Sequence, residues 1–200
     1  MEELHLKKEL DEKLQSEFPW LKQPELHKEK PYEWVDGYNN YENYGFSEVG
    51  NGWYQLIYEL CAEIEKIYKE AGQPVTMKLV QVKSKFARLR WYYDLPGKEQ
   101  TIHAFDFIGN ASLRLYPEGE VDSLESKLAE CVRRYEAKSI TICETCGADN
   151  AEICNEPPVF RWVSTLCPKC KEDRIALYNS KMEERAQIKK KMLESKKKEE

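Results

Sequence analysis

Two pairs of cysteines are the residues whose type and spacing most clearly predict chemistry in this chain. The stretch "CETCGADNAEICNEPPVFRWVSTLCPKC" contains Cys143-x2-Cys146 and Cys167-x2-Cys170, with 20 residues between the pairs. Each pair can place two thiolates on one side of a metal ion, and two pairs complete the tetrahedral sulfur set of structural zinc. The spacing therefore predicts one structural zinc ion per chain, held in a four-cysteine zinc ribbon.

Other uses of these cysteines fit the sequence less well. Seven cysteines are an odd number, so a closed set of disulfides would leave one thiol over. A redox pair needs a βαβ context, and iron–sulfur clusters usually have other spacings. Four thiolates leave no open position on the metal, which argues against catalytic zinc. Cys154 is expected to be a free loop thiol, although the spacing also allows it to replace one ligand.

Composition and charge narrow the class of protein. The 200 residues are 41% hydrophobic and 34% charged, which allows one or two small domains with exposed helices. The net charge of −5 excludes a uniformly basic protein that coats nucleic acid but permits a local basic patch. The charged N-terminus does not resemble a secretory signal, and no apolar run is long enough to span a membrane. We therefore expect a cytoplasmic protein with no membrane association.

The elements that must position the cysteines belong to an α+β fold. Apolar residues recur at helical spacing over 53–71 and 121–139, and alternation over 75–94 predicts a β-hairpin. The expected fold is a small antiparallel sheet packed with two amphipathic helices, then the zinc ribbon and a C-terminal helical tail. The expected divisions are a charged N-terminal helix and linker (1–30), an α+β core (31–139), the ribbon (140–174) and a charged tail (175–200).

The predicted hairpin is basic and aromatic on one face. The second arm alternates between two faces. The face expected in the core carries Ala87, Leu89, Trp91 and Tyr93, and the other face carries Arg88, Arg90 and Tyr92. The candidate residues for binding nucleic acid or another partner are Lys78, Lys83, Lys85, Phe86, Arg88, Arg90 and Tyr92, joined by Lys98. Cations would neutralise phosphates while an aromatic ring stacks on a base. The alternative is an ordinary solvated face of an amphipathic hairpin.

Four motifs occur in a fixed order: "NGWYQLIYELC", "VQVKSKFARLRWYY", "CETCG" and "WVSTLCPKC". Through these motifs the chain resembles a family of small uncharacterised bacteriophage and prophage proteins. That family has a Gly-Trp-led helix, a Gln-Val-Lys-x-Lys-Phe hairpin and a four-cysteine ribbon. The resemblance covers roughly residues 44–95 and 139–170. Ala87 stands where the family usually has glycine, and the insert at 99–119 is longer than expected. The resemblance implies a phage origin and an accessory role within a bacterial host.

Three functions follow from these features. The first is an accessory protein, with no enzymatic activity, that binds a host or defence-system protein through the aromatic stretch 31–52 and the tail helix. The second is a nucleic-acid-binding protein that uses the basic hairpin 77–98. The third is a metal-dependent nuclease built on Asp94, Asp106 and Glu118, for which no recognisable motif exists. The oligomeric state stays open.

Overall fold

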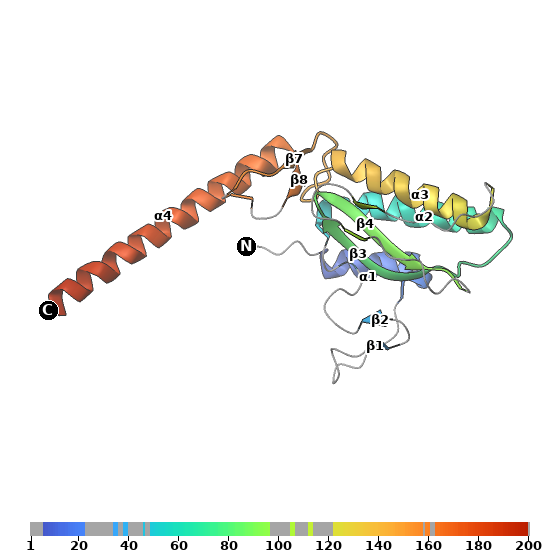
Figure 1. Cartoon of the computed structure of the whole chain (residues 1–200), viewed down its shortest axis with the longest axis horizontal. Coiled ribbons are helices and arrows are strands. Elements are labelled where there is room, and N and C mark those ends of the chain that lie inside the picture. Colours follow the sequence, from blue (N-terminus) through green and yellow to red (C-terminus); the bar gives the residue numbers. More distant parts are fainter. Residues whose placement is uncertain are drawn as a thin grey trace.

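The computed structural model describes residues 6–22, 34–35, 38–39, 46, 49–96, 105–106, 112–113, 122–157, 159–160 and 163–199. Within them the fold is α+β, as predicted (Figure 1). The helices are α1 (Lys8–Glu17), η1 (Pro19–Leu21), η2 (Asn51–Trp53), α2 (Tyr54–Glu70), α3 (Leu124–Lys138), η3 (Ser139–Thr141) and α4 (Pro168–Glu199). The strands are β1 (Trp34–Val35), β2 (Tyr38–Asn39), β3 (Lys78–Lys85), β4 (Arg88–Asp94), β5 (Phe105–Asp106), β6 (Ser112–Leu113), β7 (Glu152–Cys154) and β8 (Ser164–Leu166). They form four antiparallel pairs.

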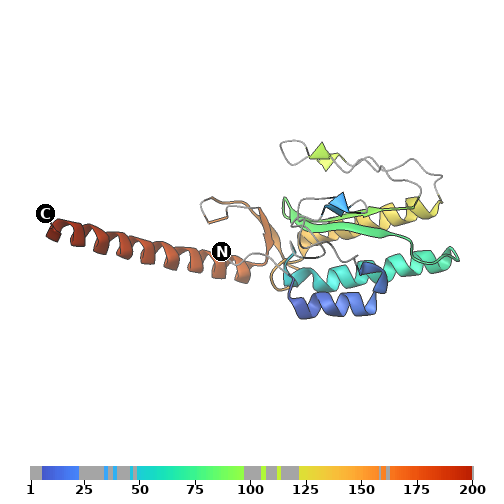
Figure 2. The ribbon, with the colours of Figure 1, turned by 90° about the horizontal axis from the view of Figure 1, so that it is seen from below.

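One hydrophobic core joins α1, α2, α3 and the β3–β4 hairpin (Figures 1 and 2). The helical periodicity places the apolar stripe of α2 inward, so that Ile57, Leu60 and Ile64 are fully buried. The stripe of α3 does the same through Leu128 and Val132. Cys61 of α2 and Cys131 of α3 also lie in this core.

The N-terminal helix is part of this core. Leu14, Phe18 and Leu21 are buried in the same cluster as the stripe of α2. The indole N–H of Trp20 donates to Glu65 of α2 at 3.1 Å, and its ring contacts Trp91 of β4 edge to face. The segment formed by α1 and η1 therefore packs against α2 and the hairpin.

The strand register confirms the predicted faces of the hairpin. Val82 pairs with Trp91 and Ser84 with Leu89 on the core side, while Lys83 pairs with Arg90 and Lys85 with Arg88 on the outer side. A bulge between Leu79 and Gln81 absorbs one residue of β3. Ala87 belongs to the turn and not to the second arm.

At the outer edge of β4, side chains of α3 and η3 accept the backbone hydrogen bonds that a third strand would otherwise accept. The backbone N–H of Trp91 donates to Glu136 Oε1 at 2.8 Å, and that of Leu89 donates to Ser139 Oγ at 2.9 Å. Both acceptors are buried. Buried backbone donors need such partners, because an unmet one costs about 1–3 kcal/mol. The two polar side chains thus allow a two-stranded sheet to end inside the fold.

We expect Glu136→Ala to lower the free energy of unfolding by about 1–3 kcal/mol, because the Trp91 amide loses its acceptor. Glu136→Gln keeps an amide oxygen at the same place and should cost clearly less. Urea denaturation of the two variants beside the natural chain measures the difference. Equal losses for both variants would mean that the hydrogen bond is not what stabilises this edge.

The turn of the hairpin has an unusual backbone. Phe86 and Ala87 have φ values of 53° and 59°, the left-handed region that a two-residue type I′ turn requires. Asn and Gly are the residues that normally occupy these positions, since a larger L-residue costs about 1–2 kcal/mol there. The Ala87 carbonyl is held by a hydrogen bond from Thr165 Oγ1 at 2.6 Å. A bulky aromatic residue therefore occupies a strained position at the tip.

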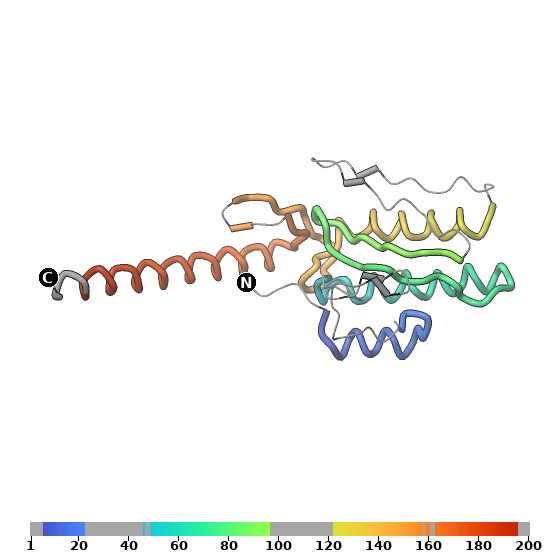
Figure 3. The backbone as a smooth tube through the Cα atoms, turned by 60° about the horizontal axis from the view of Figure 1, so that its bottom comes forward, coloured from blue at the N-terminus to red at the C-terminus, as the bar shows by residue number. Residues whose placement is uncertain are grey.

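The last helix projects away from the body over most of its length (Figures 1 and 3). It runs unbroken across the predicted division between residues 174 and 175. Among the described residues, no helix combines the length and the apolar character needed to cross a membrane.

Candidate metal centre

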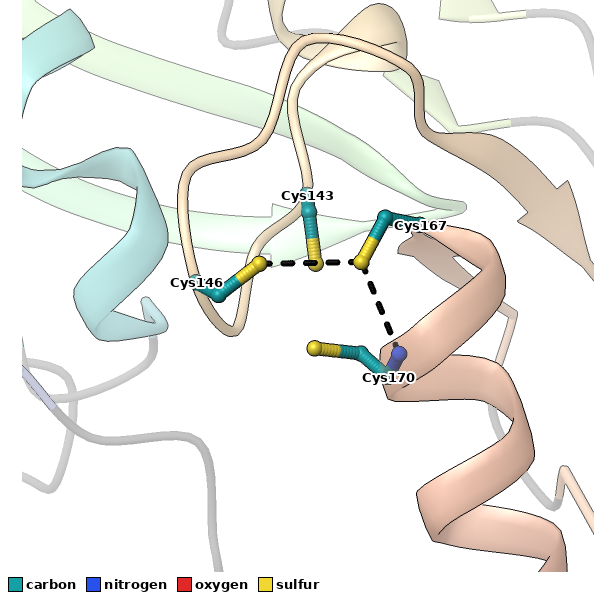
Figure 4. Close-up of side chains that lie close together, drawn as sticks. All are labelled: Cys143, Cys146, Cys167 and Cys170. Atoms are coloured by element: carbon teal, nitrogen blue, oxygen red, sulfur yellow. Dashed lines mark hydrogen bonds between the residues drawn. The ribbon is translucent and has the colours of Figure 1, made fainter.

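The four predicted ligands converge from two different kinds of element (Figure 4). Cys143 and Cys146 lie on the tight loop that follows η3, while Cys167 and Cys170 lie at the start of α4. Pro168 is the first residue of α4, where its missing N–H and fixed φ suit a helix N-terminus. The second pair therefore belongs to a helix and not to a second loop, and the β7–β8 hairpin connects the two pairs.

The sulfur atoms are close enough to share one ion. All four Sγ atoms lie within 4.8 Å of one another, and those of Cys146 and Cys167 are 3.6 Å apart. Metal–sulfur bonds of about 2.3 Å in a tetrahedron place the sulfurs about 3.8 Å apart. The four side chains point toward a common centre in Figure 4. These cysteines can hold a metal ion with only small adjustments.

The backbone around the first pair prepares a thiolate. Burial raises the pKa of Cys143, but backbone N–H groups of Cys167, Cys146 and Thr145 lower it to about 7. Thiolates, and not thiols, bind metals. Gly147 has φ +83° and its N–H donates to the Cys143 carbonyl at 2.9 Å, so this glycine supplies the left-handed backbone that the turn requires.

The first loop is fastened to the N-terminus of α2. The N–H of Gly52 donates to the Glu144 carbonyl at 3.0 Å, and the indole N–H of Trp53 donates to the Ile142 carbonyl at 2.8 Å. A Cβ atom on Gly52 would lie 2.0 Å from the carbonyl oxygen of Cys143 and 2.5 Å from the nitrogen of Gly147. Only glycine permits the two backbones to approach this closely.

The metal loop is also fastened to the hairpin through Glu144, which sits between the two ligands of the first pair. Its carboxylate is fully buried and accepts from Ser84 Oγ of β3 at 3.0 Å. Burial raises the pKa of Glu144, while hydrogen bonds from Ser164 and Ser84 and the charge of Arg174 oppose that rise. Thr165 of β8 adds the hydrogen bond to the Ala87 carbonyl. The metal centre is thus a junction between α2, the hairpin tip and α4.

Cys154 lies outside the group of four thiols. It is buried on β7, and its thiol donates to the Glu152 carbonyl at 3.6 Å. Burial raises the pKa of Cys154, which disfavours the thiolate. The expectation that Cys154 lies in a loop is wrong, because it is the last residue of β7 and is buried. The sequence analysis did not identify Gly52 or Glu144 as part of the site. The signals for them were a glycine directly before a predicted helix and an acidic residue between two predicted metal ligands.

The structure brings together only some of the basic residues predicted on the hairpin. Lys83, Lys85 and Arg88 cluster near the turn with Phe86, while Tyr92 pairs with Gln81, two register positions beyond the Lys83–Arg90 pair. Lys78 lies seven residues from Lys85, roughly 20 Å along the strand, and pairs across from Asp94.

The prediction that Arg90 faces water is wrong. Its side chain is only 7% exposed, although the register places it on the outer face. Arg90 is the third residue of β4 and is more deeply buried than Lys85 and Arg88 beside the turn, which are half-buried.

Several predicted residues lie outside the described part of the chain. These are Lys98, Glu118, most of the aromatic stretch 31–52 and the side chain of Asp106. Asp94 lies at the end of the hairpin that is remote from the turn.

Comparison with protein-family models, with curated proteins and with solved structures gives no match to this chain.

Proposed function

We propose that Cys143, Cys146, Cys167 and Cys170 hold one structural zinc ion in a phage-type accessory protein that acts by binding a protein partner. The convergence of four thiols is the observation that carries the first half of this proposal. An ion bound by four protein thiolates has no open position for water or substrate. Soft sulfur ligands in a tetrahedral set favour zinc among the common divalent ions. The ion would therefore stabilise the fold and take no part in a reaction.

The position of the ion supports a scaffold role. It joins the loop after η3 to the first turn of α4, next to the contacts with Gly52, Ser84 and Ala87. The first turns of α4 contact the β7–β8 region through Ile175, through Lys171, which pairs with Glu156, and through Arg174, whose guanidinium donates to Ser164 Oγ at 3.0 Å. The ion would consequently set the direction in which α4 leaves the body.

The projecting part of α4 supports binding of a protein. It carries five large apolar side chains that are between 43% and 62% exposed: Leu177, Met182, Ile188, Met192 and Leu193. At 100° per residue, Met182 and Leu193 share one face, while Leu177, Ile188 and Met192 share another. Exposed apolar groups on two faces suit a partner that wraps around the helix. A host or defence-system protein is the partner class that we propose.

Removal of α4 beyond Asn179 should separate folding from function. The side chains of residues 180–195 are exposed, so the truncated chain should keep its metal and melt within a few degrees of the full chain. It should lose the partner. The measurement is a tagged pull-down from host extract, treated with nuclease, with the full and the truncated chains side by side.

Three outcomes would contradict the partner proposal. In the first, a protein retained equally by both chains shows that another surface binds it. In the second, nuclease removes all the retained material. The third is a full chain that self-associates by light scattering while the truncated chain is a monomer, which assigns α4 to contacts between copies. A large drop in melting temperature on truncation would show that α4 packs on the body.

A further inference from the structure

The tip of the β3–β4 hairpin combines clustered cations with a strained and exposed aromatic residue. Lys83 lies opposite Arg90 and Lys85 lies opposite Arg88, with the Ser84–Leu89 pair between them, so four cationic residues gather beside the turn. Phe86 has a strained backbone at φ 53° and is 42% exposed. Backbone strain at an exposed aromatic residue is typical of binding sites.

The tip is held firmly in place. Thr165 binds the Ala87 carbonyl, Ser139 binds the Leu89 amide, and Ser84 binds the buried Glu144 of the metal loop. These contacts come from β8, from η3 and from the loop of the first cysteine pair. The backbone of the tip is therefore held in place without a ligand, so its ordering costs no further entropy on binding.

We propose that this tip binds single-stranded nucleic acid, with Phe86 stacking on a base and Lys83, Lys85 and Arg88 contacting phosphates. The Lys85 ammonium lies 5.6 Å from the centre of the Phe86 ring, and Lys83 lies 5.3 Å from that of Tyr92. Cations beside exposed aromatic rings are the combination that single strands require, because unpaired bases offer their faces for stacking. Duplex bases are stacked on each other and cannot use the ring. This proposal is independent of the partner of α4.

The Phe86→Asn variant removes the ring and also suits the left-handed turn. We expect its unfolding midpoint to equal or exceed that of the natural chain, so that lost binding cannot be attributed to unfolding. The Lys85→Gln/Arg88→Gln variant removes two of the proposed phosphate contacts. Lys66→Gln/Lys69→Gln on the exposed side of α2 changes the charge equally and serves as the matched control.

The test is fluorescence anisotropy with a labelled oligothymidylate of about 15 nucleotides and with a duplex of the same length, using the full chain loaded with zinc. Three phosphate contacts give a slope of roughly −2 in log affinity against log salt, about a tenfold loss between 50 and 150 mM. Phe86→Asn should weaken single-strand binding about tenfold. Lys85→Gln/Arg88→Gln should flatten the salt slope, and the α2 control should bind normally.

Several results would overturn the proposal. One is the absence of salt-sensitive binding by the natural chain at 50 mM salt. The basic tip would then be a contact for an acidic protein surface. Another is undiminished binding by Phe86→Asn, or a duplex bound as tightly as the single strand. The third is complete loss of binding after truncation at Asn179, which would assign the phosphate contacts to the lysine-rich end of α4.

Discussion

Gly52→Ala is expected to destabilise the protein by more than about 4 kcal/mol, a loss reached by few single substitutions. The added Cβ would lie 2.0 Å from the Cys143 carbonyl oxygen and 2.7 Å from the Cys146 nitrogen. Both atoms belong to the backbone, so no side-chain rotation relieves the clash. The loop that carries two of the four thiols must move away from the N-terminus of α2.

The same substitution should weaken metal binding, because displacement of the loop separates Cys143 and Cys146 from the second pair. Thermal and urea denaturation measure the first effect, and zinc per chain after dialysis measures the second. Gly72→Ala is the matched control. That glycine has φ +67° but no atom within 4 Å of its added Cβ, so we expect about 1 kcal/mol and full metal content. A loss for Gly52→Ala as small as that of the control would show that the two backbones are not in contact.

Cys167→Ser should lose most of its zinc and unfold the region around the β7–β8 hairpin. Cys143, Cys154, Phe160, Leu166 and Cys167 form a separate cluster of buried residues that is too small to stay folded without the ion. The core of α1, α2, α3 and the β3–β4 hairpin has its own apolar faces and should remain partly folded. Hydrogen exchange with and without a chelator should show this difference between the two clusters.

Cys154→Ser is the matched control for the ligand set, since it removes a buried thiol from the same cluster without touching the four converging sulfurs. It should keep about one zinc per chain. If Cys154→Ser loses the metal while Cys143→Ser retains it, the assignment of the four metal ligands is wrong.

The apolar periodicity of the sequence was sufficient to predict the helical core and the faces of the hairpin. Ile57, Leu60 and Ile64 recur at helical spacing and are buried, and Leu89 and Trp91 alternate with Arg88 as a strand requires. The four metal-binding candidates were predictable for a similar reason. Two Cys-x-x-Cys pairs specify a local geometry that does not depend on the rest of the fold.

The hydrogen bonds that join α3 and η3 to β4, and the burial of Arg90, were not predictable from apolar periodicity. Glu136 and Ser139 continue the apolar stripe of Val132 on α3, but a polar residue there ordinarily indicates a solvated position. Their partners are amides of a strand about 45 residues earlier, which only the tertiary structure identifies. Arg90 was assigned to water from alternation alone, since alternation gives the face of a strand and not how deeply that face is covered.

X-ray absorption at the zinc edge, on the purified full chain, tests the metal centre most directly. The spectrum should fit four sulfur atoms at about 2.3 Å with no nitrogen or oxygen ligand, for about one zinc per chain. A nitrogen or oxygen atom in the coordination sphere, or a chain purified without metal under reducing conditions, would contradict a closed structural site of Cys143, Cys146, Cys167 and Cys170.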